Sequence, residues 1–152
     1  MPSVKTVAIG VVSLAVVGTA AMVLTANPAR ARTIVVYKSP TCGCCNQWIA
    51  HLEANGFRVE ARDVNDLGRI KAEVGITSAN AACHTALIDG YVIEGHVPAD
   101  VIARLLDERP DIAGLSVPGM PMGSPGMEGP RREPYHVYAL ARNGSREVYA
   151  AR

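Results

Sequence analysis

Residues 33–54, with the sequence TIVVYKSPTCGCCNQWIAHLEA, decide how this chain folds. They begin with a run of β-favouring residues and pass through a Ser-Pro-Thr turn. They then continue with apolar residues at helical spacing, namely Trp48, Ile49 and Leu52. The stretch therefore predicts a strand, a short turn and a helix, and the helix begins beside three cysteines.

Those cysteines, Cys42, Cys44 and Cys45, occupy three of four consecutive positions. A strand, a short turn and Cys-x-x-Cys at the start of a helix are typical of thioredoxin-type redox proteins. A dithiol redox site needs only two sulfurs, however, and Cys44 supplies a third. Three convergent sulfurs, with a fourth at Cys83, favour a site for a soft metal ion. A Cys42–Cys45 disulfide beside two spectator thiols is the alternative.

The N-terminal residues 1–31 are predicted to be a secretory signal peptide. Residues 7–26 form an almost unbroken apolar run, Lys5 is the only charge in residues 1–29, and Ala29-Arg30-Ala31 provides an A-x-A cleavage site. The run is also long enough to span a bilayer, so an uncleaved membrane anchor is the alternative. In both cases we expect residues 32–152 to form one domain outside the cytoplasm.

The composition of residues 32–152 limits the partners of this domain. It has 13 basic and 14 acidic residues, a formal charge of −1, and no run of Lys or Arg. Nucleic acid is therefore not expected as a partner. Outside the cytoplasm thiols tend to oxidise unless a metal or a reductase protects them. Cys42–Cys45 is the only local disulfide that closes comfortably, which leaves Cys44 and Cys83 to pair with each other or to serve another purpose.

Strand and helix patterns alternate through residue 110. The first strand is expected at 33–38 and the first helix at 45–54, with Ser39 or Thr41 as its candidate cap. The pattern then predicts a strand at 57–64 and a helix at 65–74. Strands at 84–88 and 91–94 follow around the turn Asp89-Gly90, and then a helix from Pro98 to Pro110. This β-α-β-α-β-β-α order is that of the thioredoxin/glutaredoxin fold, in the α/β class.

A segment rich in Gly, Pro and Met follows, at residues 114–134. Its density of helix and strand breakers predicts a loop or a lid with no regular structure. After it, strands at 134–141 and 147–150 around Asn143-Gly144 predict a C-terminal hairpin.

Sulfur-only ligation favours Cu(I), Zn(II) or an iron–sulfur cluster. Zinc sites usually combine two separated pairs of Cys or His, and no second pair is present. Adjacent thiolates that each bridge two ions suit Cu(I). At the start of a helix they are also stabilised by backbone N–H groups and the helix dipole. We therefore expect a multinuclear Cu(I)–thiolate cluster.

Further candidates lie outside the first helix. Residues 81–88 contain Cys83 and His84 at the place where a thioredoxin-like chain carries a cis-proline. The absence of this proline disfavours disulfide exchange, and the Cys and His in its place favour a metal site. His84 is expected to be a ligand or to support one. Met120, Met122 and Met127 either bind copper through their thioethers or fill gaps under the loop. His96 is expected to be a hydrogen-bonded structural residue, His51 to lie on a solvated helix face, and His136 to have no role in the site.

Four motifs, which occur in the same order, resemble the small exported CopG-type copper-resistance proteins. They are SPTCGCC at 39–45, CHTA at 83–86, GYVIEGHVP at 90–98 and VPGMPMGSPGME at 117–128. The resemblance covers roughly residues 33–150. It implies a thioredoxin-like fold, a periplasmic location, a role in copper redox handling, and copper ligation by Cys42, Cys44, Cys45 and Cys83. It extends less directly to His84 and the three methionines.

The leading hypothesis is a periplasmic copper-binding protein of copper resistance that holds Cu(I) on its cysteines, with cycling between Cu(I) and Cu(II) as an added activity. Its partners would be copper ions and copper efflux or periplasmic copper proteins, and it would touch the membrane only through an uncleaved leader. The rival hypothesis is a periplasmic thiol–disulfide oxidoreductase that uses Cys42 and Cys45. A third is a copper chaperone that docks on an efflux partner.

Overall fold

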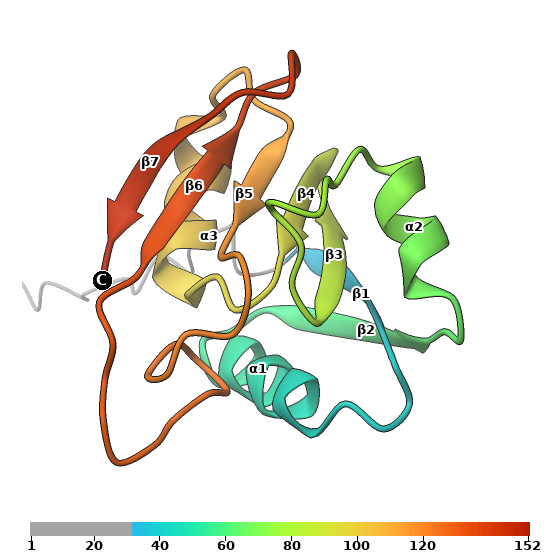
Figure 1. Ribbon diagram of the computed structural model, residues 1–152, viewed down its shortest axis with the longest axis vertical. Coiled ribbons are helices and arrows are strands. Elements are labelled where there is room, and N and C mark those ends of the chain that lie inside the picture. The colour runs from blue at the N-terminus through green and yellow to red at the C-terminus, as the bar shows by residue number, and fades with distance from the viewer. Residues whose placement is uncertain (1–31) are drawn as a thin grey trace, which may run out of the picture.

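The computed structural model describes residues 32–152, and the predicted signal peptide or anchor lies outside the described residues. The described chain is a mixed α/β fold with three helices and one seven-stranded sheet (Figure 1). No helix within residues 32–152 is long and apolar enough to cross a membrane.

Strands and helices follow one another in the order β1 (Thr33–Lys38), α1 (Gly43–Ala54), β2 (Arg58–Asp63), α2 (Leu67–Glu73), β3 (His84–Ile88), β4 (Tyr91–Glu94), α3 (Ala99–Glu108), β5 (Gly114–Ser116), β6 (His136–Leu140) and β7 (Arg146–Ala151). The order across the sheet is β2-β1-β3-β4-β5-β6-β7. The β1–β2 and β4–β5 pairs are parallel and the others are antiparallel. Because α1 and α3 each join two parallel neighbours, both act as crossover helices.

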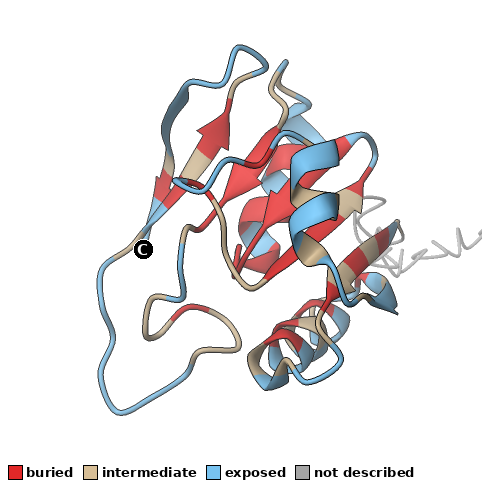
Figure 2. Cartoon of the chain, turned by 45° about the vertical axis from the view of Figure 1, so that its right-hand side comes forward, coloured by how far each residue is buried: buried red, intermediate tan, exposed pale blue. Residues whose placement is uncertain are grey.

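The two faces of the sheet are covered unequally. Alternate residues of the central strands, such as Ile34, Ala86 and Ile93, join the main core with side chains of α1 and α3. The opposite face carries a smaller cluster of Ile76, Val92 and Leu140. On this side α2 has no buried residues of its own, so it is largely exposed in Figure 2. The well-packed side is the one that supports the start of α1.

The prediction that residues 114–134 contain no regular structure is wrong at their beginning. Gly114–Ser116 forms β5, which pairs with β4 on one side and β6 on the other. A Cβ at Gly114 would overlap the carbonyl oxygen of Val92, so only glycine allows this close approach. Gly114, one of the residues from which a loop was predicted, therefore allows β5 to pair with β4. Through β5 the C-terminal hairpin of β6 and β7 joins the sheet.

Helix α1 begins two residues earlier than predicted, and its expected side-chain cap is absent. Cys42 is the N-cap residue and makes no side-chain capping bond. The hydroxyls of Ser39 and Thr41 lie 3.2 Å from each other instead. Within the described part of the chain, the first-turn N–H groups of α1 therefore have no side-chain acceptor, and they lie next to the cysteines.

Candidate metal centre

The four cysteines come from two segments that the sheet brings together. Cys42 is at the N-cap position of α1, and Cys44 and Cys45 lie in its first turn. Cys83 stands directly before β3. Since β1 and β3 are antiparallel and pair Lys38 with His84, the start of β3 lies beside the end of β1, from which the chain turns into α1.

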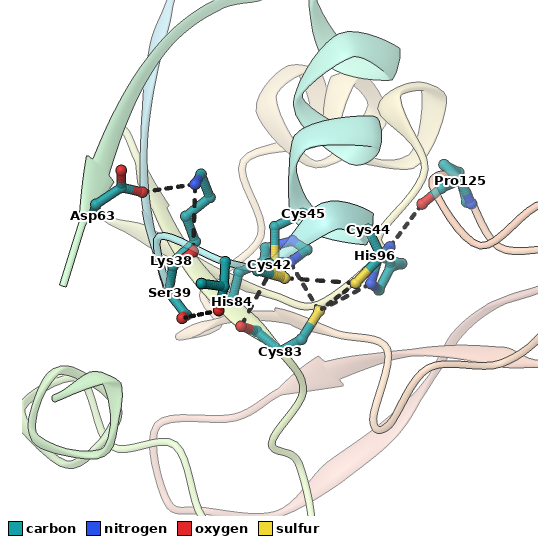
Figure 3. Close-up of a disulfide and its surroundings, with 11 residues drawn as sticks. Lys38, Ser39, Cys42, Cys44, Cys45, Asp63, Cys83, His84, His96 and Pro125 are labelled. Carbon is teal, nitrogen blue, oxygen red and sulfur yellow. Dashed lines mark hydrogen bonds and ion pairs between the residues drawn. A yellow bond between two sulfur atoms is a disulfide. The ribbon is translucent and has the colours of Figure 1, made fainter. Parts of the chain in front are cut away.

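The sulfur atoms of Cys42, Cys44, Cys45 and Cys83 all lie within 4.8 Å of one another (Figure 3). Cys44 is central: its Sγ lies 3.5 Å from Cys42 Sγ and 3.7 Å from Cys83 Sγ. Four soft donors in so small a volume match the preference of Cu(I) and other thiophilic ions.

Two of these sulfurs are joined. Cys42 and Cys45 form a disulfide across a Cα–Cα distance of 5.4 Å, while Cys44 and Cys83 are free thiols. This is the pair that the cysteine spacing indicated as the only local disulfide with suitable geometry. In this redox state the centre offers two thiols, and a two-electron reduction of the disulfide would provide two more.

The Cys83 thiol is protonated at neutral pH in the metal-free protein. Burial raises its pKa to about 12, and the neighbouring Cys44 acts in the same direction. The charge of Lys71 opposes this rise. A thiophilic metal must therefore displace a proton from Cys83 when it binds.

His96 is a residue of this centre that the sequence analysis assigned to a structural role. Its Nε2 lies 3.0 Å from Cys83 Sγ, and its Nδ1 lies 2.7 Å from the carbonyl oxygen of Pro125. Because a carbonyl can only accept, Nδ1 carries the hydrogen and the Nε2 lone pair faces the thiol. Burial lowers the pKa of His96 and so favours the neutral ring. A histidine oriented by a backbone carbonyl in this way is typical of metal sites.

His84 approaches Cys83 from the core side. Its Nδ1 lies 3.3 Å from Cys83 Sγ, and its ring packs on Trp48 with centroids 4.2 Å apart. Nε2 is buried and has no hydrogen-bond partner among residues 32–152. Burial, with a contribution from His96, lowers the pKa of His84 to about 3, so the ring stays neutral over the physiological range. One donor atom each of Cys83, His84 and His96 also lie within 4.8 Å of one another.

The Gly/Pro/Met-rich loop reaches the centre through its backbone. Besides the bond from His96 to Pro125, Gly126 lies against the first turns of α1 with φ +84°. A Cβ at Gly126 would stand 2.8 Å from Cys44 O and 2.7 Å from Trp48 N. Only glycine therefore lets the loop pass this close to the first turns of α1. Figure 1 shows the loop between β5 and β6 beside α1.

The three methionines of that loop differ in exposure and contacts. Met120 is 53% exposed and Met127 is half-buried, while the Met122 thioether packs beside Gly129 within the loop. Their role as ligands stays a prediction.

The expectation of a solvated His51 is wrong. His51 is half-buried and its Nε2 accepts the N–H of Ala99 at 3.1 Å, which caps the start of α3. His136 is exposed on β6.

Comparisons with known proteins agree with this arrangement. Residues 80–127 match a family model described as a protein of unknown function, DUF411. A solved structure called copper resistance protein CopG, Form 2, is 47% identical with a TM-score of 0.76, over 80% of this chain and 98% of that one. Form 1 is also 47% identical, with a TM-score of 0.75, over 79% and 96%. Nothing among the curated proteins matches. At this identity and coverage, the chain belongs to the CopG family of copper-resistance proteins.

Proposed function

We propose that this protein is a periplasmic copper-binding protein of copper resistance that holds Cu(I) on Cys42, Cys44, Cys45 and Cys83. One observation carries the proposal: four sulfurs from two separate segments lie within 4.8 Å of one another. The relatives named for copper resistance support copper as the ion. The predicted leader supports export. The β2-β1-β3-β4 order, with β1 and β2 parallel and β3 antiparallel to β1, supports a thioredoxin-like core.

The redox state of the disulfide sets the number of donors. With Cys42 and Cys45 bonded, the donors are the thiols of Cys44 and Cys83 and the imidazole nitrogens beside Cys83. Reduction adds two thiolates, which can bridge ions and extend the site to a multinuclear cluster. We infer that the reduced form is the one that takes up several Cu(I) ions.

The same cysteines can supply electrons. Oxidation of the Cys42/Cys45 dithiol gives two electrons to two Cu(II) ions, which become Cu(I), while the disulfide forms and two protons leave. A thiol reductant would then restore the dithiol. The disulfide between these residues supports such cycling as an added activity.

Anaerobic titration of the reduced protein with Cu(I), followed by native mass spectrometry, tests the proposal. The wild-type chain should bind several copper ions, and Cys44→Ser should lose them together because Cys44 links the other sulfurs. His136→Gln, which changes an exposed histidine, is the matched control and should bind as the wild type does. A wild-type chain that takes up no Cu(I) would refute the proposal.

A second candidate, a thiol–disulfide oxidoreductase, is favoured by the disulfide at the N-terminus of α1. It predicts insulin reduction that depends on Cys42 and Cys45, survives Cys44→Ser and ignores copper. Insulin reduction at the uncatalysed rate by the reduced wild-type protein would remove this candidate.

The partners that receive the copper would be efflux or other periplasmic copper proteins. The exposed Met120 on the loop supports a docking role for this segment. Met120→Ala should then slow transfer to such an acceptor without changing the copper stoichiometry. An unchanged transfer rate would contradict the docking role.

A further inference from the structure

A buried ion pair stands beside the cysteine centre, on the α2 side of the sheet. Glu94 of β4 is fully buried, and Lys71 of α2 forms a salt bridge with its Oε1. Thr85, the cross-strand partner of Glu94, donates its hydroxyl to Oε2 at 2.7 Å. Lys71 also donates to Thr85 Oγ1 at 2.9 Å. Since a buried carboxylate needs paired charge and hydrogen bonds, these contacts fix its orientation.

The remaining contact of this carboxylate is with the segment that carries Cys83. Glu94 Oε1 accepts the backbone N–H of Ala82 at 2.7 Å. On its other side the segment meets the loop, where Ala82 bridges to Gly119 and the Gly119 N–H donates to the Ala81 carbonyl at 3.0 Å. The Glu94 carboxylate thus ties Ala82, the residue before the Cys83 thiol, to the sheet. Ser116 of β5 holds the same segment two residues earlier, where its hydroxyl donates to the Asn80 carbonyl at 2.7 Å.

Cys83 has little room for displacement, since its Sγ contacts His96 Nε2, His84 Nδ1 and Cys44 Sγ at 3.0, 3.3 and 3.7 Å. A metal-binding constellation works only within about 0.5 Å of its productive geometry. We propose that Glu94, braced by Lys71 and Thr85, is a positioning residue of the metal centre that places Cys83 Sγ through the Ala82 N–H. This inference rests on the proposed function for the identity of the metal.

Two double variants separate position from charge. Lys71→Met with Glu94→Gln removes both charges but keeps an oxygen that can accept the Ala82 N–H. Lys71→Met with Glu94→Leu removes the charges and the acceptor together. Both variants replace the two members of the ion pair together and leave no unpaired buried charge, so both should fold. Circular dichroism and thermal unfolding verify this before any binding measurement.

The main readout is the Cu(I) affinity of the full chain, reduced and anaerobic, in competition with a coloured Cu(I) chelator. The Gln variant should bind like the wild type. The Leu variant should bind about 10- to 100-fold more weakly, the usual effect of losing a group that orients a ligand. In a Cys83→Ser background the Leu replacement should cause no further loss, because the group that it misplaces is gone.

Three results would overturn the proposal: wild-type affinity in the Leu variant, equal losses in the two double variants, or a full additional loss in the Cys83→Ser background. A second readout needs no copper. The alkylation rate of Cys83 in the metal-free protein, followed by peptide mass spectrometry, should differ from the wild-type rate in the Leu variant alone. An unchanged rate overturns the inference too. A wild-type chain that binds no Cu(I) refutes the proposed function instead, and the alkylation rates still decide on Glu94.

Discussion

The burial of His84 predicts that acid destabilises the metal-free protein. Its pKa of about 3 in the folded state compares with an ordinary 6.5 in the unfolded chain. Below pH 6.5 the unfolded chain therefore takes up a proton at this position and the folded protein does not. The stability from neutral His84 is complete above pH 6.5 and falls as the pH drops toward 3. From pH 7.5 to 5.0 the loss in unfolding free energy is about 2 kcal/mol.

Urea unfolding of the metal-free, disulfide-bonded protein at pH 7.5 and 5.0 measures this loss. His84→Leu replaces the ring by a non-titrating side chain of similar size. Its decrease in stability between the two pH values should be about 2 kcal/mol smaller than that of the wild type. His136→Gln, on the exposed face of β6, should keep the wild-type dependence. Identical pH dependence in His84→Leu and the wild type would refute the reasoning.

Three further outcomes follow from the contacts around the centre. Gly126→Ala should destabilise the protein by about 1–2 kcal/mol, because an alanine there adopts a left-handed backbone and its Cβ meets the start of α1. Thermal unfolding of the metal-free protein measures this, and an unchanged midpoint would contradict it. The Cu(I) affinity should rise between pH 6 and 8 by about tenfold per pH unit for each thiol proton released, because the Cys83 thiol is protonated there. Chelator competition at several pH values measures the slope, and a flat profile would speak against Cys83 as a ligand. His51→Ala should lower the unfolding free energy by about 1 kcal/mol, through the unpaired Ala99 N–H, and leave the copper stoichiometry unchanged. A loss of copper without a loss of stability would contradict the capping role.

The contact between Cys83 and His96 could have been predicted from the sequence. The turn Asp89-Gly90 was predicted, and a two-residue turn fixes the register of its hairpin. That register pairs Thr85 with Glu94, and its continuation by two residues sets Cys83 opposite His96. The strands were predicted without a register beyond their ends, so His96 was expected to be a structural residue.

Other parts of the centre could not be predicted from sequence patterns. Gly114 contributed to the prediction of a loop, because local propensity does not show that β4 lies too close for any residue larger than glycine. The contacts of Pro125 with His96 and of Gly126 with α1 depend on the path of a long loop, and no periodicity in the sequence indicates that path. His51 pairs with the N–H of Ala99, a residue far along the chain. The strand-turn-helix that carries the three cysteines, by contrast, is defined by local signals and was predicted almost to its bounds.

X-ray absorption at the copper edge of the Cu(I)-loaded, reduced protein tests the central claim most directly. The account predicts a first shell dominated by sulfur, together with a short copper–copper distance, because the four thiolates are close enough to bridge neighbouring ions. Cys44→Ser should remove the copper–copper feature. A first shell of nitrogen and oxygen without sulfur would contradict a centre built on these cysteines.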